Sequence, residues 1–388
     1  MGKAGAPRRR THIGKGESYM AASKVYFTDF RSHGRTSQLE KLEKLVLAAG
    51  LDEIDFEGKF VAIKLHFGEL GNMAYLRPNY ARVVADLVRE RGGKPFLTDC
   101  NTLYVGSRKD ALEHMDTAML NGYSPLSTGC QIIIGDGLKG SDDVEVPVAG
   151  GQYVQNAKIG RAIMDADIFI SLTHFKGHEN AGFGGALKNI GMGCGSRRGK
   201  MEMHASGKPY VDQDDCVGCG ACSKICAHGA PIVTNGKCEI DEAKCVGCGR
   251  CIAVCPKDAV SPRFDQSVKL LNYKIAEYSK AVVDGRPSFH ICIVRDVSPN
   301  CDCHAENDVP VVPDVGMFAS FDPVALDCAC ADAINRQPAL PNSSISDRCA
   351  EDDHDRFHAV HPNTRWQDAV EHGEAIGLGQ RAYELIRV

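Results

Sequence analysis

Two cysteine runs near the middle of this chain read Cys216-Val-Gly-Cys219-Gly-Ala-Cys222-Ser-Lys-Ile-Cys226 and Cys245-Val-Gly-Cys248-Gly-Arg-Cys251-Ile-Ala-Val-Cys255-Pro256. Each cysteine of the first run recurs 29 residues later in the second, so one small supersecondary unit is repeated. The chain has 18 cysteines, and eight of them make up these two runs. A C-x2-C-x2-C loop wraps three thiolates around one centre and needs a fourth ligand from elsewhere. The runs therefore predict metal ligation rather than disulfide bonds.

The spacing is typical of two-cluster ferredoxins, in which the fourth cysteine of each run serves the other cluster. We therefore expect two [4Fe–4S] clusters. The ligands expected for the first cluster are Cys216, Cys219, Cys222 and Cys255. The ligands expected for the second are Cys245, Cys248, Cys251 and Cys226. Zinc is the alternative, because C-x2-C pairs also bind zinc, but it does not explain the third cysteine of each run. Cys238 matches no ligand position and is expected to be a small buried residue.

The composition is that of a folded soluble protein, with 43% hydrophobic and 24% charged residues. A length of 388 residues allows about two domains. The net charge of −5 does not favour nucleic acid or an anionic membrane as a partner. No apolar run approaches the ~18 residues that span a bilayer. The first 20 residues are basic but carry no apolar stretch typical of a signal peptide, so we expect a cytoplasmic protein with reduced thiols.

Around the cysteine runs, apolar stretches of strand length alternate with helical patterns. This alternation predicts an α/β fold with a mainly parallel sheet and flanking helices. The expected strands are 59–67, 95–99, 131–135, 167–174 and 289–296. The expected helices are 36–47, 77–91, 108–120, 268–283, 323–334 and 366–377. The cysteine runs are expected to form an inserted α+β ferredoxin-like domain. The predicted division is a disordered basic tail (1–23), the α/β domain in two parts (24–209 and 264–388) and the insert (210–263).

Polar residues follow several of the expected strands, at the edge where open α/β sheets bind ligands. His66 lies at the end of the first strand, and His174 and Lys176 lie at the end of the fourth. Each is also explained as a turn or capping residue. Together they predict a site at the carboxyl edge of the sheet, with His66, His174 and Lys176 as candidate catalytic residues.

A glycine-rich segment, 182–200, carries Lys188, Arg197 and Arg198. A glycine-rich backbone beside fixed cations favours a small anionic ligand. The three cations are therefore further candidate catalytic residues. The segment matches neither a Walker A nor a Rossmann fingerprint. The alternative is that its glycines permit close packing.

A third feature is Cys301-Asp-Cys303-His304. Two cysteines at i and i+2 in an irregular segment bring both thiols near one point. With Cys194 or a histidine they are candidate ligands of a third metal or cluster. Reduced structural thiols are the alternative.

Several of these segments together resemble one known family. They are Lys64–Glu69, Phe183–Lys200, Cys301–Cys303, Val312–Asp327 and the ending from His361 to Gly379. At these positions the chain looks like a DUF362 protein, a domain of unknown function that is often joined to a ferredoxin module. The resemblance covers residues 24–388 and implies an iron–sulfur protein without naming a reaction.

The sequence leaves three functional hypotheses open. The first is an iron–sulfur electron-transfer protein of an anaerobic redox system, passing low-potential electrons to a partner or to a site in its own α/β domain. Its expected partners are redox proteins such as ferredoxin, flavodoxin or a reductase. The second is a self-contained reductase that holds a substrate or an extra metal near Gly182–Arg198 and Cys301–His304. The third is an assembly or maturation factor for another metalloenzyme.

Overall fold

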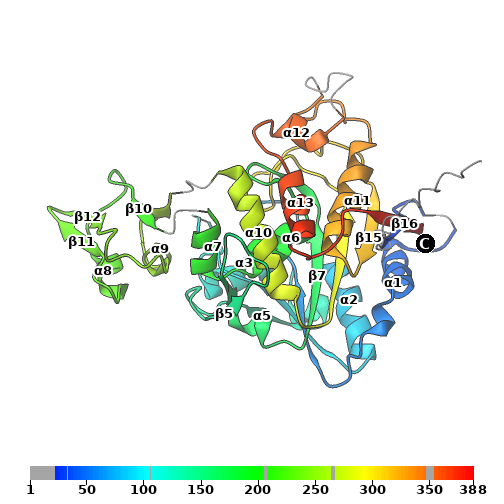
Figure 1. The fold of residues 1–388 in the computed structure, drawn as a ribbon, viewed down its shortest axis with the longest axis horizontal. Coiled ribbons are helices and arrows are strands. Elements are labelled where there is room, and N and C mark those ends of the chain that lie inside the picture. Colours follow the sequence, from blue (N-terminus) through cyan, green and yellow to red (C-terminus); the bar gives the residue numbers. More distant parts are fainter. Residues whose placement is uncertain (1–21, 33, 105, 205–207, 264–266, 347–353) are drawn as a thin grey trace, which may run out of the picture.

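The computed structural model describes residues 22–32, 34–104, 106–204, 208–263, 267–346 and 354–388. The expected N-terminal tail lies almost entirely outside the described residues. An eight-stranded sheet forms the centre of the fold (Figure 1). Its strands, in spatial order, are β16 (Tyr383–Arg387), β1 (Ser23–Asp29), β15 (Gly316–Ser320), β14 (Ser288–Val294), β7 (Ile168–His174), β2 (Phe60–Lys64), β3 (Lys94–Asp99) and β4 (Gln131–Ile134).

The sheet is mainly parallel, as predicted. Only β15 runs antiparallel to its neighbours β1 and β14, and the other paired strands are parallel. All five predicted strands are present as β2, β3, β4, β7 and β14. β7 is buried along its whole length, which is usual where helices cover both faces of a parallel sheet.

Two hydrophobic cores lie on opposite faces of the sheet because strand side chains alternate between the faces. Ile168, Ile170 and Leu172 of β7 enter one core, whereas Phe169 enters the other. The first core is covered by α1 (Gln38–Ala48), α2 (Pro78–Glu90), α3 (Ala111–Leu120), α4 (Pro125–Thr128) and the 3-10 turn η1 (Leu51–Glu53). The second is covered by α5 (Arg161–Met164), α6 (Ala186–Cys194), α10 (Val268–Val283), α11 (Pro323–Asn335), α12 (Arg356–Val360) and α13 (Gln367–Ala375).

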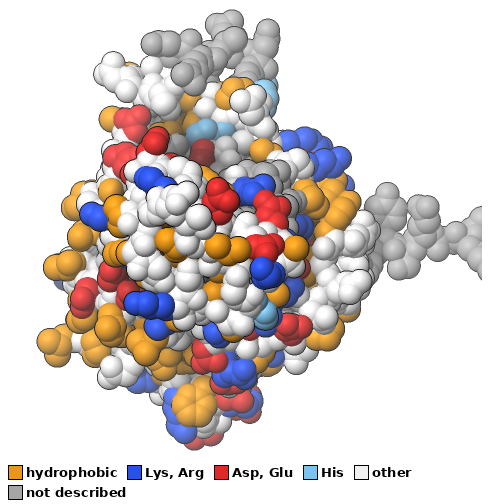
Figure 2. Space-filling model, turned by 90° about the vertical axis from the view of Figure 1, so that its left-hand side faces the viewer, with side chains coloured by type: hydrophobic (Ala, Val, Ile, Leu, Met, Phe, Trp, Pro, Cys, Tyr) orange, Lys and Arg blue, Asp and Glu red, His pale blue; other side chains and the backbone are white. Residues whose placement is uncertain are grey.

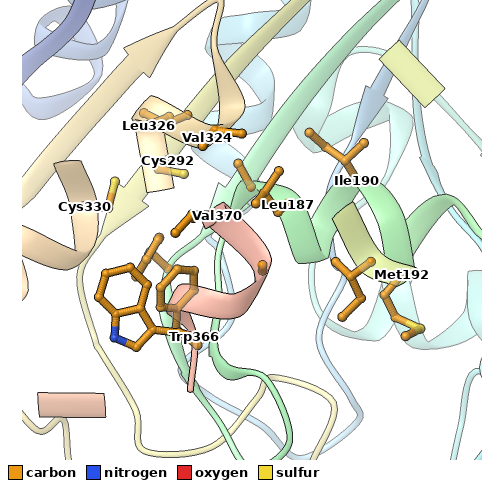
Figure 3. Close-up of a cluster of buried hydrophobic side chains, with 14 of the residues drawn as sticks. Leu187, Ile190, Met192, Cys292, Val324, Leu326, Cys330, Trp366 and Val370 are labelled. Atoms are coloured by element: carbon orange, nitrogen blue, oxygen red, sulfur yellow. The ribbon is translucent and has the colours of Figure 1, made fainter. Parts of the chain in front are cut away.

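Helix α6 occupies the middle of the second core. Figure 3 shows its Leu187 close to Val324 and Leu326 of α11, with Val370 of α13 alongside. The glycines of this segment allow the close approach. A Cβ on Gly191 would lie 2.2 Å from the Ile275 carbonyl oxygen of α10, and one on Gly185 would lie 2.4 Å from the Asp327 carboxylate. α6 therefore contacts its neighbours through backbone at these positions.

Two short antiparallel pairs lie outside the main sheet, and α6 is followed by helix α7 (Arg197–His204). They are β5 (Asp143–Pro147) with β6 (Asn156–Gly160), and β8 (Lys176–His178) with β9 (Gly182–Gly184). β8 and β9 direct the chain from the carboxyl end of β7 into α6. This path places the residues after β7 at the sheet edge.

The cysteine runs lie in a projecting unit, which we call the cysteine module (residues 209–262; Figure 1). Its elements are β10 (Pro209–Val211), α8 (Ala221–Ile225), β11 (Pro231–Thr234), β12 (Lys237–Ile240), α9 (Arg250–Ala253) and β13 (Val260–Pro262). Entry and exit strands pair, with Pro209 opposite Pro262. The module thus leaves and rejoins the α/β domain at one place, which is the geometry of an insertion.

Candidate functional site

A cavity of about 640 Å³ lies over the carboxyl ends of β2, β3 and β7. Its walls come from distant parts of the chain, and the lining includes Lys64, His66, Asp99, Arg108, Lys176, His178, Lys188, Lys200, Cys301 and Cys303. Parallel strands bring their carboxyl ends to one edge, and the helices that follow leave a crevice there. The predicted location of the site is therefore where the structure has its cavity.

The floor of the cavity holds a buried ion pair. The Lys64 ammonium lies 3.0 Å from the Asp99 carboxylate, and both side chains are almost fully buried. Asn189 of α6 accepts a second hydrogen bond from Lys64 at 2.8 Å. Burial alone would raise the pKa of Asp99, but the charge of Lys64 outweighs it and the pKa is lowered. Asp99 is thus held ionised and in place beside Lys64.

A second buried pair joins Arg108 to Glu69, with Nε donating to the carboxylate at 3.0 Å. Another nitrogen of the Arg108 guanidinium lies 3.0 Å from Nε2 of His66. Burial and the nearby Arg108 charge hold the pKa of His66 well below its ordinary value. His66 therefore faces the cavity as a neutral ring.

Cys301 and Cys303 lie together on the cavity wall. Their sulfur atoms and one ring nitrogen of His178 all lie within 4.8 Å of one another. The Cys303 sulfur also lies within 4.8 Å of a carboxylate oxygen of Glu179 and a ring nitrogen of His304. The neighbouring Cys303 and burial raise the pKa of Cys301 to about 12, whereas the contact with Cys301 lowers the pKa of Cys303. Of the two thiols, Cys303 is thus the one that loses its proton first.

Asp302, between the two cysteines, is fully buried and anchors the segment. Its carboxylate accepts from His174 Nδ1 at 2.9 Å and lies 3.2 Å from the Lys176 ammonium. Burial opposes ionisation, but His174 and Lys176 prevail and lower the pKa of Asp302 to about 2. His174 is thereby a support of the cysteine segment, and it does not line the cavity.

Lys188 of α6 points its charge toward this thiol pair. It lines the cavity, and burial and the Lys188 charge lower the pKa of His178. The same charge opposes Cys303 and burial, which raise the pKa of Cys301, and adds to the effect of Cys301, which lowers the pKa of Cys303. Among the described residues it has no carboxylate or hydrogen-bond partner, unlike Lys64 and Lys176. Lys188 is therefore the cavity cation best placed for an added anion.

The backbone donors at the start of α6 are already occupied. The N–H groups of Ala186 and Leu187 donate to the Asp327 carboxylate at 2.6 and 2.9 Å. A carboxylate is favoured there by the helix dipole. The backbone N–H groups at the start of α6 are thus occupied by a carboxyl group of the chain itself, and binding of a small anion by Lys188 stays a prediction.

Three other predicted residues lie away from the cavity. Arg197 is buried and donates to the backbone carbonyls of Lys139 and Lys109. Arg198 forms an ion pair with Asp143 at 2.7 Å. Cys194 is buried behind the cavity, outside the group that Cys301 and Cys303 form. Of the six candidate catalytic residues, the structure brings His66, Lys176 and Lys188 together in the cavity.

The cysteine module contains two small pockets, one lined by five cysteines and the other by four. One is lined by Cys216, Cys219, Cys222 and Cys255, with Cys238 beside them. The other is lined by Cys226, Cys245, Cys248 and Cys251. The eight cysteines that the sequence divides into two ligand sets thus line two separate pockets, and their binding of clusters stays a prediction. Buried Cys238 lies 3.4 Å from the Cys222 sulfur, so it packs against the first set.

The two cysteine loops share a backbone conformation. Gly218 and Gly220 have φ of 62° and 75°, and Gly247 and Gly249 both have φ of 69°. Positive φ is the left-handed region that glycine adopts without a Cβ penalty. Backbone N–H groups also point at sulfur, with Gly247 donating to Cys245 at 3.5 Å. These features fit a group with several sulfur-ligated corners.

The spacing of the module sulfurs does not favour single zinc ions. Four thiolates around one zinc, at ~2.3 Å each, would lie about 3.8 Å apart. In the part of the chain that the structure describes, groups of three or more possible metal ligands whose ligand atoms all lie within 4.8 Å of one another occur at the cavity wall, and none comes from the module. A cubane holds its thiolates farther apart, at its outer corners.

The module contacts the α/β domain beside the cavity. Gly249 of the second cysteine loop lies against the side chain of Arg197 of α7, where a Cβ would come within 2.9 Å. Leu103 and Met201 join the small hydrophobic core of the module, and Lys109 pairs with Asp258 at 3.0 Å. Leu103 also lines the cavity, so one residue touches both sites.

Comparison with protein families identifies the α/β domain. The family model described as "Domain of unknown function (DUF362)" matches residues 61–332. The chain belongs to this family. Its similarity to the "Thylakoid-associated protein sll1697" of Synechocystis sp. is 30% identity over 140 residues, which is 34% of this chain and 37% of that protein. The chain thus spans little more than a third of the length of this relative.

Two solved structures resemble the DUF362 chain weakly. One is a crystal structure of a protein from Thermotoga maritima, with 14% identity, a TM-score of 0.36, and coverage of 76% of this chain and 57% of that one. The other is the lactate racemase apoprotein from Thermoanaerobacterium thermosaccharolyticum, with 12% identity, a TM-score of 0.37, and coverage of 82% and 59%. Within the described residues, no helix is both long and apolar enough to cross a bilayer.

Several cavity residues of this DUF362 protein were not singled out from the sequence. Arg108 lies in an expected helix, and only folding places it beside Glu69, 39 residues earlier. His178 follows the strand-end residues His174 and Lys176, so the strand-end rule extended by one short strand would have included it. Asn189 of α6 carried no sequence signal, because its role depends on contact with Lys64.

Proposed function

We propose that this DUF362 protein is an iron–sulfur electron-transfer protein that passes electrons from its cysteine module to a site in its own α/β domain. The residues that would hold the two [4Fe–4S] clusters are the two sets of four cysteines that line the module pockets. When bound, such clusters each accept and release one electron. The site that would use the electrons is the cavity beside the module.

The observation that carries the proposal is the position of α7. Its Arg197 and Met201 contact the second cysteine loop at Gly249, and its Lys200 and His204 line the cavity. One helix of eight residues thus touches both places. A simple carrier protein needs no such cavity, so the arrangement supports use of the electrons within the chain.

The outer face of the module supports entry of electrons from a partner protein. Val217 and Val246, each next to the first cysteine of a run, are 57% and 61% exposed. Figure 2 looks onto this side of the molecule, where apolar side chains are interspersed with charges of both signs. α9 lies nearer to α7 than α8 does, so α8 of the first cysteine run lies toward the outer end of the module (Figure 1). A small redox protein such as ferredoxin or flavodoxin fits this face.

Anaerobic reconstitution tests the proposal. The protein should bind about eight irons and eight sulfides, and dithionite should bleach its visible absorption. Cys219→Ser and Cys248→Ser should each lose about half of the iron, because each removes a ligand of a different pocket. Cys130→Ser, outside the module, is the matched control and should keep about eight irons. Zinc in place of iron in protein prepared without oxygen would sink the proposal.

A further inference from the structure

The two thiols at the cavity wall differ in how accessible they are to a molecule in the cavity. Cys301 is only 4% exposed, whereas Cys303 is partly exposed, and both line the cavity. Their sulfurs lie within 4.8 Å of each other with no bond between them. Cys303 is therefore the sulfur that a molecule in the cavity would meet, and Cys301 stands directly behind it.

The backbone between the two thiols is fixed. Asp302 is held by His174 and Lys176 through its carboxylate, and its carbonyl oxygen accepts from the Glu69 N–H at 2.8 Å. A segment anchored on both the side chain and the backbone keeps its neighbours in register. The two sulfurs thus stay adjacent without needing a disulfide or a metal to hold them.

The hydrogen bonds of His178 favour a proton donor over a metal ligand. Its Nδ1 accepts from the backbone N–H groups of Asn180 at 3.0 Å and Ala181 at 3.2 Å. A neutral imidazole whose Nδ1 accepts must carry its proton on Nε2. Metal-bound histidines usually show the opposite arrangement, with the second nitrogen donating to an acceptor. His178 is thus a neutral ring beside the thiol pair, with its proton on Nε2.

We infer that Cys301 and Cys303 form a redox-active dithiol pair that reduces small organic disulfides in the cavity, an inference that deepens the proposed function and rests on it. Cys303, as thiolate, attacks one sulfur of the substrate disulfide, and the first substrate sulfur leaves and takes a proton. Cys301 then gives up its proton, attacks Cys303, and releases the second substrate sulfur as a thiol. The products are two substrate thiols and a Cys301–Cys303 disulfide.

The pair returns to the dithiol with two electrons and two protons, which break the S–S bond and leave a thiol on each cysteine. The proposed electron transfer supplies the two electrons. The Lys188 ammonium, close to both sulfurs, stabilises the thiolates that form in each half of the cycle. A cavity of about 640 Å³ admits a small disulfide and excludes a folded protein.

The test uses the cluster-loaded full chain under anaerobic conditions, with bis(2-hydroxyethyl) disulfide as the probe. After exposure to the probe, denaturation and alkylation, mass spectrometry should find Cys301 and Cys303 unalkylated and joined. After dithionite, both should be alkylated. The oxidised wild type should take up about four electrons in a reductive titration, against about two for the Cys301→Ser, Cys303→Ser double variant.

The matched control is Cys292→Ala with Cys330→Ala. This second pair of neighbouring thiols is buried in the core between β14 and α11 (Figure 3). It lies outside the cavity lining, so this variant should still take up about four electrons.

Three results would overturn the inference. One is a wild type that binds about eight irons but takes up only about two electrons and keeps both thiols open to alkylation. Another is loss of a bound metal other than iron from the Cys301→Ser, Cys303→Ser variant, which would make the pair a metal site. The third is the same electron count in that variant as in the wild type. Absence of iron would instead refute the proposed function, and the alkylation result is read independently of iron content.

Discussion

Replacing Asp302 by Asn tests whether the cysteine segment depends on its buried anchor. The change keeps the shape of the side chain but removes the charge that faces His174 and Lys176. The pKa of Asp302 is lowered from 3.8 to about 2. A difference of this size corresponds to about 2 kcal/mol of folding free energy. Removing one partner of a buried pair costs about 3–5 kcal/mol in other proteins, so we expect a loss of about 2–4 kcal/mol.

The pH dependence of this contribution has a definite sign. A carboxyl whose pKa is lower in the folded state stabilises the fold above its unfolded pKa, and the contribution is lost as the pH falls through the folded pKa. For Asp302 that window runs from about pH 4 down to about pH 2. The difference between wild type and Asp302→Asn should therefore not shrink between pH 8 and pH 5.

Urea unfolding followed by tryptophan fluorescence measures the effect. Trp366 is the single tryptophan, is 9% exposed, and packs against Phe183 in the α/β domain, so it reports on that domain rather than on the module. A loss of about 2–4 kcal/mol should lower the midpoint by about 1 M. The control is Asp52→Asn, which removes an exposed partner of Arg91 and should change stability by less than about 1 kcal/mol. The reasoning is wrong if the Asp302→Asn midpoint equals that of the control, or if the difference shrinks between pH 8 and pH 5.

Three further variants separate roles that the structure assigns to single residues. Gly218→Ala should lose about half of the bound iron, because the new Cβ would lie 2.3 Å from the Gly236 carbonyl oxygen. Gly220→Ala is the control, since it has a similar φ but open space around it, and it should keep about eight irons by elemental analysis. Equal loss of iron in both variants would contradict this account. Asp327→Ala should cost about 1–3 kcal/mol in urea unfolding, because the N–H groups of Ala186 and Leu187 lose their acceptor; an unchanged midpoint would show that this capping contributes nothing. Lys188→Gln should leave the free energy of unfolding within about 0.5 kcal/mol of the wild-type value while slowing the reaction with the disulfide probe. An unchanged rate would show that Lys188 does not act at the site.

The fold was predictable from the sequence in its central part. The predicted strands β2, β3, β7 and β14 are the buried middle of the sheet, where continuous apolar runs are their own signal. The strands β1, β15 and β16 were not predicted. β16 is a half-exposed edge strand that pairs with β1, so the two ends of the chain meet there. Such pairing depends on partners hundreds of residues apart and leaves little local pattern.

The sequence by itself determined the two cysteine sets, because the C-x2-C-x2-C loops are local. Their spacing and glycines predict which sulfurs line each pocket, and the repeat predicts the exchange of the fourth cysteine between them. Only the tertiary structure decided which residues line the cavity. In the folded chain, Lys188 lines the same cavity as Cys301 and Cys303. His174 hydrogen-bonds to Asp302, and Arg197 contacts the module at Gly249. The physical reason is that these contacts join separate elements, and the direction of a side chain depends on how those elements pack rather than on its neighbours in the chain.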